Sequence, residues 1–311
     1  MFSGQGSHYY QMGRDLFDHD ALFRRNMLHM NEVAGDLLGL SLTDILYQNR
    51  KSDVFDRTLL SSSAIFAIEY ALAQTLIGNG VEPALVLGAS LGVYCSICVA
   101  DCLKADKALA TVIGQSRIFE ERCEPGFMLA LLASPRLYSD SPVLHRNSEI
   151  AALNYSGHFV ISARQPDLQQ IESFLRDREI TYYRLPVSLP FHTRWTEPAR
   201  SATLALFESL QFAPPQLSVV CCGQASPRDA ITPAFLWASL RECIDFERTI
   251  LRLELQGPHR YIDVGPMGTL ATFLKYLLPP TSQSRVHSVM TPLGGDLKRL
   301  RELLTAARTS G

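Results

Sequence analysis

The sequence lacks a strong excess of charge of either sign. Its 311 residues include 29 Lys and Arg and 31 Asp and Glu, for a net charge of -2 at pH 7. Nucleic acids and anionic membrane surfaces select clustered positive charge, so we expect neither as a partner. The sequence also lacks an apolar run of transmembrane length and a basic-then-apolar signal peptide. These absences predict a cytoplasmic protein, and we further expect a monomer.

The sequence lacks a disulfide pattern and a metal-binding pattern of cysteines. The seven cysteines are an odd number; Cys95, Cys98 and Cys102 recur at helical spacing, and Cys221 and Cys222 follow two valines. No second pair of ligands occurs at the spacing typical of a metal site, so these residues fit small buried side chains. We expect no metal and no bound cofactor.

What the sequence does have is enough apolar character for a large core, since 47% of its residues are hydrophobic. Strand-like and helix-like segments alternate on either side of residues 126–192, which is typical of an α/β fold with a parallel sheet. Residues 126–192 have a different texture, in which short strands dominate. The prediction is a large, hydrolase-like parallel-sheet domain formed by residues 1–125 and 193–311, with a small ferredoxin-like α+β subdomain inserted at residues 126–192. Its expected elements are strands 127–133, 149–153, 159–163 and 182–187 and helix 166–178.

The chain is organised around Gly88-Ala89-Ser90-Leu91-Gly92, which follows the apolar run Ala84-Leu85-Val86-Leu87. A fully apolar run predicts a buried parallel strand, and helical spacing resumes at Val93. Gly-x-Ser-x-Gly between a strand and a helix is the context of a nucleophile elbow, where small neighbours let a strained turn close. Ser90 is then expected at its apex, with the N–H of Leu91 available to an oxyanion. The alternative is a glycine-rich turn that holds a serine by chance.

A serine nucleophile needs a base, because its free hydroxyl is almost wholly protonated at neutral pH. His192 is the best candidate, since it stands in Pro190-Phe191-His192, where the chain re-enters the large domain. There is room for little more than one strand before Ser90, which disfavours an α/β-hydrolase. The histidines in polar or loop contexts are expected at the surface: His8, His19, His29, His145 and His158.

Four motifs occur in an order that covers nearly the whole chain: Gly4-Gln5-Gly6-Ser7, the serine elbow, Phe191-His192 and Asp263-Val264-Gly265-Pro266. On these motifs the chain resembles the malonyl-CoA:acyl-carrier-protein transacylase family, which includes the acyltransferase domains of polyketide synthases. The resemblance implies a Ser90–His192 dyad without a carboxylate, because the family's histidine is oriented mainly by backbone carbonyls. It also implies an oxyanion hole formed by the N–H groups of Gln5 and Leu91.

The same resemblance implies the substrate and the partner. The acyl group is carried on the phosphopantetheine of an acyl carrier protein or on CoA, and it enters a groove between the two domains. Asn154 matches a family asparagine that lines this groove. The alternative, of equal weight, is that it is simply a turn residue in Asn154-Tyr155-Ser156-Gly157, because asparagine is common in turns.

The chain departs from the family at two positions near the nucleophile. Ala89 replaces the histidine that usually precedes the serine, which makes the site less polar. Gln115 stands 25 positions after Ser90, where malonyl-transferring members place an arginine for the malonyl carboxylate. An amide cannot form the charge-assisted pair that a guanidinium makes, and Arg117 starts about 200° round the helix axis from Gln115. A phenylalanine at the position of Phe191 is common in malonyl-specific members, and it favours malonyl as the substrate.

These departures predict an acyl hydrolase that takes uncharged acyl groups from acyl carrier proteins. They are similar to those of the free-standing acyl hydrolase branch of trans-acyltransferase polyketide synthase pathways, which clears stalled chains. The alternative within the same fold is a transacylase that loads malonyl or an unusual acyl group onto a carrier protein. A third possibility is a catalytically silent docking module, which the presence of Ser90, His192 and Gln5 disfavours.

Overall fold

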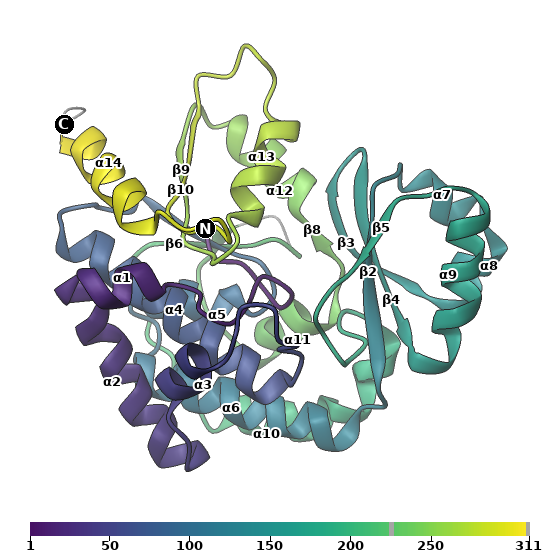
Figure 1. Cartoon of the computed structure of the whole chain (residues 1–311), viewed down its shortest axis with the longest axis horizontal. Helices are drawn as coiled ribbons and strands as arrows, with labels where there is room; N and C mark the ends of the chain where they lie inside the picture. Colours follow the sequence, from purple (N-terminus) through teal and green to yellow (C-terminus); the bar gives the residue numbers. More distant parts are fainter. Residues whose placement is uncertain (224–226, 309–311) are drawn as a thin grey trace.

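The computed structural model describes residues 1–223 and 227–308, and these form a helix-rich α/β part beside a smaller sheet (Figure 1). In the larger part, β1 pairs in parallel with β6, and β9 pairs in parallel with β10. The start of the chain lies between these pairs, because Phe2 N–H donates to Leu87 O and Val264 N–H donates to Met1 O. The strands of this part are β1 (Leu85–Gly88), β6 (Ser218–Cys221), β7 (Pro227–Arg228), β9 (Arg260–Asp263) and β10 (Arg285–Ser288).

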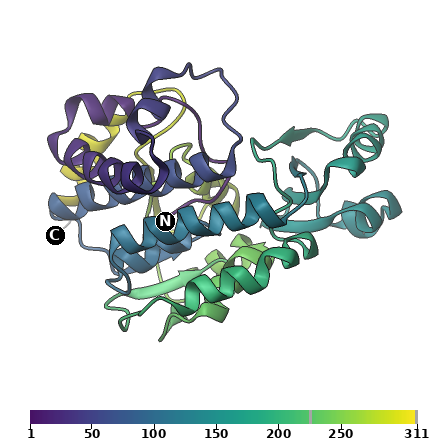
Figure 2. The same ribbon diagram turned by 90° about the horizontal axis from the view of Figure 1, so that it is seen from below.

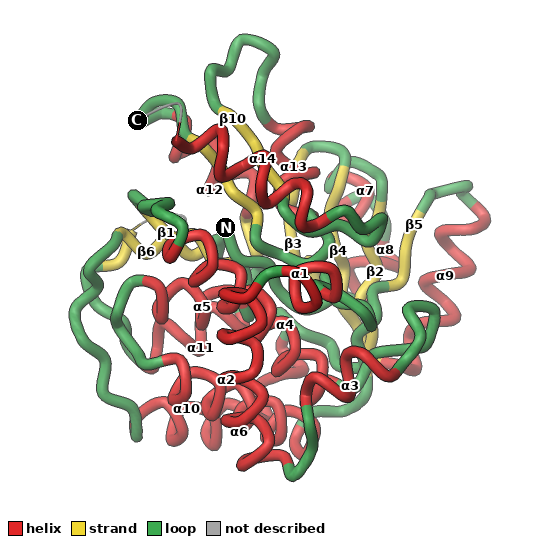
Figure 3. The backbone as a smooth tube through the Cα atoms, turned by 60° about the vertical axis from the view of Figure 1, so that its left-hand side comes forward, coloured by secondary structure: helices red, strands yellow, loops and turns green. Residues whose placement is uncertain are grey.

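Helices surround these strands, and α2, α4 and α6 lie side by side (Figures 1 and 3). Each of the three presents apolar side chains to its neighbours, so their contact forms the main core. The helices of this part are α1 (Arg14–His19), α2 (Ala21–Leu38), α3 (Leu42–Gln48), α4 (Thr58–Gly78), α5 (Gly92–Val99), α6 (Ala105–Arg122), α10 (Arg200–Glu208), α11 (Pro233–Arg241), α12 (Phe246–Glu254), α13 (Thr269–Leu277) and α14 (Asp296–Arg308).

Helix α4 corrects one expectation from the sequence. By length and composition it is the one described helix that could cross a membrane, although the sequence shows no unbroken apolar run of that length. However, 78% of its most apolar window is buried inside the protein, where it contacts α2, α5 and α6. It is packed as the core helix of a globular fold.

The inserted segment forms a separate sheet whose order is β5-β2-β4-β3, with every pair antiparallel. In chain order its elements read βαββαβ, which is the ferredoxin-like arrangement. Figure 2 shows this subdomain projecting from the rest of the molecule. The sequence pattern did not predict α7 and α8, which are short. The elements are β2 (Gly126–Leu131), α7 (Arg136–Ser139), α8 (Pro142–Asn147), β3 (Glu149–Tyr155), β4 (His158–Arg164), α9 (Leu168–Asp177) and β5 (Tyr182–Arg184).

Strand alternation gives the small sheet two different faces. On β2, Phe127, Leu129 and Leu131 pack in a core with side chains of α9. The intervening Met128 and Ala130 point to the opposite face, because successive side chains in a strand alternate. That second face turns toward the larger part, and β8 (Ile244–Asp245) extends the sheet by pairing in parallel with β3. The small subdomain therefore supplies one wall of whatever lies between the two parts.

The cysteines lie where their contexts predict. None of the seven forms a disulfide within the described part of the chain; six of them are buried and Cys243 is partly buried.

Candidate active site

Ser90 stands at a sharp turn between β1 and α5, with φ of 54° in the left-handed region that non-glycine residues rarely adopt. The flanking glycines are required by close backbone approach. A Cβ on Gly92 would lie 2.3 Å from the carbonyl oxygen of Phe2, and one on Gly88 would lie 2.6 Å from the backbone of Val93. The strained turn therefore has the geometry of a nucleophile elbow.

His192 comes from the segment that follows the small subdomain, and its Nε2 lies 2.8 Å from Ser90 Oγ. Its Nδ1 lies 2.7 Å from the carbonyl oxygen of Glu242. A carbonyl can only accept, so Nδ1 carries the hydrogen and Nε2 of the neutral ring accepts from the serine hydroxyl. This is the tautomer that a general base needs, and it is oriented by a backbone carbonyl.

Burial keeps this imidazole neutral. His192 is 3% exposed, and desolvation lowers the pKa of its side chain to about 4, although the hydrogen bond to Glu242 opposes the shift. The positive charge of Arg241 lowers the pKa further. At neutral pH the ring is thus free to take a proton from Ser90.

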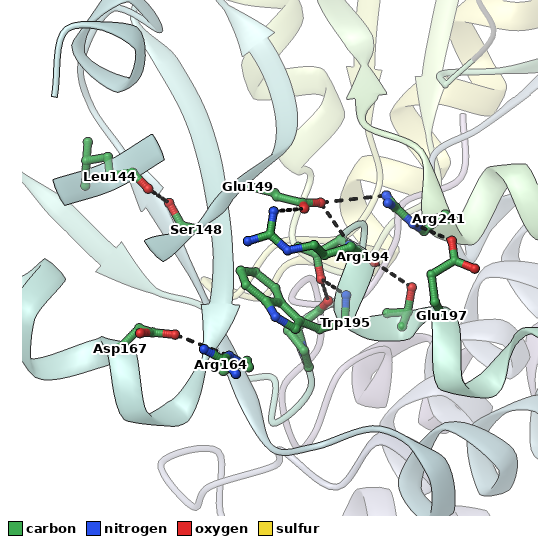
Figure 4. A network of polar contacts seen from close by, with 12 residues as sticks. Leu144, Ser148, Glu149, Arg164, Asp167, Arg194, Trp195, Glu197 and Arg241 are labelled. Atoms are coloured by element: carbon green, nitrogen blue, oxygen red, sulfur yellow. Dashed lines mark hydrogen bonds and ion pairs between the residues drawn. The ribbon is translucent and has the colours of Figure 1, made fainter. Parts of the chain in front are cut away.

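An ion-pair network joins Glu149, Arg194, Glu197 and Arg241 (Figure 4). Arg194, two residues after His192, donates its N–H and a guanidinium N–H to the Glu149 carboxylate, each at 2.9 Å. Arg241, which precedes Glu242, donates to Glu197 at 3.0 Å and lies 3.7 Å from Glu149. The network joins the segment that carries His192 to the strand β3 and to the helix that ends at the orienting carbonyl.

Two backbone N–H groups close to the nucleophile are the candidates for an oxyanion hole. Across the described ranges 1–223 and 227–308, the N–H groups of Gln5 and Leu91 donate to no other residue. The Gln5 loop approaches the elbow closely, since a Cβ on Gly4 would lie 3.0 Å from Ser90 Cβ. The Gln5 side chain turns away: its amide donates to Ser62 Oγ, and its Oε1 accepts from Ser61. The arrangement leaves two free donors for an oxygen that becomes negatively charged.

A cavity of about 280 Å³ opens beside the dyad, between the second face of the small sheet and helices α12 and α13. Ser90, His192, Ala89, Phe191 and Asn154 line it. Most of the other side chains are apolar: Met128, Ala130, Leu132, Ala152, Val160, Tyr183, Leu185, Ile244, Phe246, Met267, Leu270 and Phe273. No Lys, Arg, Asp or Glu is among the described residues that line it.

Gln115 and the Leu91 side chain lie outside this lining. Both are buried, and Gln115 Oε1 accepts a hydrogen bond of 2.5 Å from the hydroxyl of Tyr94. On the same helix as Gln115, Phe119 stacks on the cavity residue Phe191, with ring centroids 5.8 Å apart. The amide at position 115 is therefore engaged with a neighbouring helix.

Two histidines expected at the surface are not there. His158 lines the cavity, its Nδ1 lies 2.9 Å from the Asn154 amide, and its ring is 5.0 Å from that of Phe273. His8 is 3% exposed and bonds the carbonyl of Phe55. His158 was missed because it follows a turn, and turn residues are usually solvated; its position at the first residue of a strand that faces the other domain was the available signal.

Comparison with known proteins identifies the family. The whole chain, residues 1–311, matches the family described as the acyl transferase domain. The chain belongs to this family. It is 39% identical over 305 residues to the polyketide biosynthesis acyltransferase homolog BaeD of Bacillus velezensis, covering 97% of this chain and 94% of that protein. It is also 39% identical over 302 residues to the homolog PksD of Bacillus subtilis, covering 96% of this chain and 93% of that protein.

Solved acyltransferases share the fold. The loading acyltransferase of the avermectin polyketide synthase superposes with a TM-score of 0.88 at 21% identity, covering 99% of this chain and 98% of that one. The malonyl-CoA transacylase of Streptococcus pneumoniae superposes with a TM-score of 0.80 at 23% identity, covering 98% of each chain. The expected α/β fold and family are confirmed, and the chain is an enzyme of the acyltransferase fold.

Proposed function

We propose that this acyltransferase-fold enzyme is an acyl hydrolase, which removes uncharged acyl groups from acyl carrier proteins through an ester on Ser90. The observation that carries the proposal is the uncharged cavity beside the dyad. No cation is among its described lining residues, and Gln115 is bonded to Tyr94. A malonyl carboxylate would be desolvated there without a partner, whereas an alkyl chain would bury its surface.

The dyad can perform both halves of such a reaction. Ser90 Oγ attacks the thioester carbonyl carbon while His192 Nε2 takes the hydroxyl proton, and the N–H groups of Gln5 and Leu91 bind the oxyanion. The C–S bond then breaks, and His192 returns the proton to the departing pantetheine thiol. A water molecule next attacks the ester with His192 as base, which releases the acid and restores Ser90.

Water as the second acceptor is supported by Ala89. Its small side chain lines the cavity directly before Ser90, where the family usually has a histidine. This leaves room for a water within reach of His192, and an uncharged acyl group lacks a carboxylate anchor that would hold it across the line of attack. We place this reaction in the cytoplasm, in a monomer.

The test is to load Ser90 with acetyl from a carrier protein and to follow the ester by intact-protein mass spectrometry. Hydrolysis is expected at similar rates with and without added holo carrier protein. An ester that persists alone and collapses only when holo carrier protein is added would identify a transacylase. That alternative is supported by the names of the relatives, which are described as acyltransferase homologs.

A further inference from the structure

A buried carboxyl group lies behind the loop that carries Gln5. Glu69 of α4 is fully buried, and its Oε1 accepts from the N–H of Ser3 at 2.8 Å and lies 2.5 Å from Ser3 Oγ. Its Oε2 has no hydrogen-bond partner among the described residues. An ionised carboxylate with one oxygen unpartnered in the core would be costly, so the contacts of this group need an explanation.

The hydroxyls next to Glu69 form a chain of contacts that ends at Gly4, in the loop that carries Gln5. Ser3 Oγ lies 2.8 Å from Ser7 Oγ, and Ser7 Oγ lies 2.7 Å from the carbonyl oxygen of Gly4. Together with the Ser3–Glu69 contact this makes three short oxygen–oxygen links. Ser3 and Ser7 supply only one hydroxyl hydrogen each, and the Gly4 carbonyl supplies none. All three links can be hydrogen bonds only if the third hydrogen is on Glu69.

We infer that Glu69 is a neutral carboxylic acid and a positioning residue for the oxyanion hole, acting through Ser3 and Ser7 on the peptide group between Gly4 and Gln5. Its hydroxyl donates to Ser3, Ser3 donates to Ser7, and Ser7 donates to Gly4 O. The Gly4 carbonyl and the Gln5 N–H belong to one planar peptide unit, so fixing the carbonyl also aims the N–H. Hydrogen bonding to the carbonyl also polarises the unit and strengthens the N–H as a donor.

The protonation state agrees with this chain. Burial raises the pKa of Glu69 to about 8, and the hydrogen bonds that Ser3 would donate to the ionised carboxylate oppose the shift. The negative charge of Asp263 raises the pKa of Glu69 further, whereas the positive charge of the Met1 amino group lowers it. The thiol of Cys95 on α5 also interacts electrostatically with Glu69. Asp263 is also buried, but each of its carboxylate oxygens accepts a backbone N–H, from Gly265 and from Ala271, at 2.8 Å, so it has more hydrogen-bond partners to stabilise a negative charge than Glu69 has.

Deprotonation of Glu69 breaks the chain. Ser3 must then donate to the carboxylate, and Ser7 can donate to Ser3 or to Gly4 but not to both. Either choice disconnects α4 from the Gly4 carbonyl. The inference rests on the proposed roles of Ser90 and Gln5, and it predicts an alkaline fall in the rate of Ser90 acylation as Glu69 loses its proton.

The experiment measures Ser90 acylation by a short acyl thioester, and its labelling by a fluorophosphonate, between neutral and alkaline pH. In the wild type, the rate of Ser90 acylation should fall by about 2- to 10-fold as the pH rises, with a midpoint at the Glu69 pKa of about 8. This factor corresponds to the loss of one net hydrogen bond. Glu69→Gln cannot titrate and should show a flat profile. Ser7→Ala should also be flat, because it lacks the link to Gly4. The control Ser63→Ala removes a buried hydroxyl of the same helix that, within the described residues, donates to Leu59 O, and it should keep the wild-type profile.

Difference infrared spectroscopy supplies a second readout, which does not depend on turnover. The carbonyl stretch of a protonated carboxyl should be lost on raising the pH in the wild type and in Ser7→Ala, and the Glu69 contribution should be missing in Glu69→Gln. If Glu69→Gln does not fold, Ser7→Ala carries the kinetic test. A wild-type profile without the alkaline fall, or a fall that persists in Glu69→Gln, overturns the inference and leaves the proposed function standing. A Ser90 that reacts with neither reagent at any pH overturns both.

Discussion

The hydroxyl of Tyr94 donates to Oε1 of Gln115 across 2.5 Å, and this bond joins α5, which follows the nucleophile, to α6. Both side chains are buried. Position 115, which is expected to select the acyl group, therefore holds a neutral amide that is already hydrogen-bonded to Tyr94. It offers no positive charge to a substrate carboxylate.

Replacing Gln115 by Arg should restore part of the charge. We expect Gln115→Arg to raise malonyl loading relative to acetyl loading, but incompletely, because the rest of the cavity remains apolar. Burying a guanidinium beside Tyr94 should also lower the free energy of unfolding by about 1–3 kcal/mol. Gln115→Met is the matched control, since it has similar length and no charge. Equal malonyl loading by wild type and Gln115→Arg would show that this position does not select the acyl group.

Removing either member of the dyad should abolish or cripple catalysis. Ser90→Ala should form no acyl-enzyme in intact-protein mass spectrometry, and His192→Ala should slow acylation and deacylation by roughly 10³- to 10⁶-fold. Ser96→Ala is a suitable control, because it removes a buried hydroxyl from α5 that bonds Gly92 O. Turnover by Ser90→Ala at the wild-type rate would refute the proposed mechanism.

The low pKa of His192 predicts an acid-tolerant enzyme. A base works only when it is unprotonated, so kcat/KM should stay level as the pH falls through 6.5, the ordinary pKa of histidine, and should drop near the lowered value of about 4. The measurement is a pH profile of kcat/KM for a short acyl thioester, confined to conditions in which circular dichroism shows a folded protein. An acid limb near 6.5 would mean that His192 is solvated when the substrate arrives.

Small residues on β2 and β3 should set the acyl length. Ala130 and Ala152 line the cavity, and a leucine at position 130 would occupy space that an acyl chain needs. Ala130→Leu should lower kcat/KM for hexanoyl thioesters by about 10-fold or more and leave acetyl within a few-fold. Acetyl is the internal control for folding and for the dyad. An equal loss of kcat/KM for the acetyl and hexanoyl thioesters would mean that the acyl chain does not lie beside residue 130.

Local sequence was sufficient for part of this protein. An apolar run, a Gly-x-Ser-x-Gly turn and a helix are contiguous, and the close backbone approach at Gly88 and Gly92 needs no distant partner to be suspected. Short apolar runs bounded by turn residues likewise predicted the strands of the small subdomain, because strand propensity and turn chemistry are properties of a few successive residues.

Tertiary structure decided what those residues contact. Ser90 and His192 are 102 positions apart, the carbonyl that orients the ring comes from Glu242, and Glu69 reaches Ser3 across 66 positions. The inward position of His158 and the partner of Gln115 also depend on segments that meet only after folding. Composition and periodicity report burial along one element, whereas hydrogen bonds and shifted pKa values arise between elements, so only the packed structure determines them.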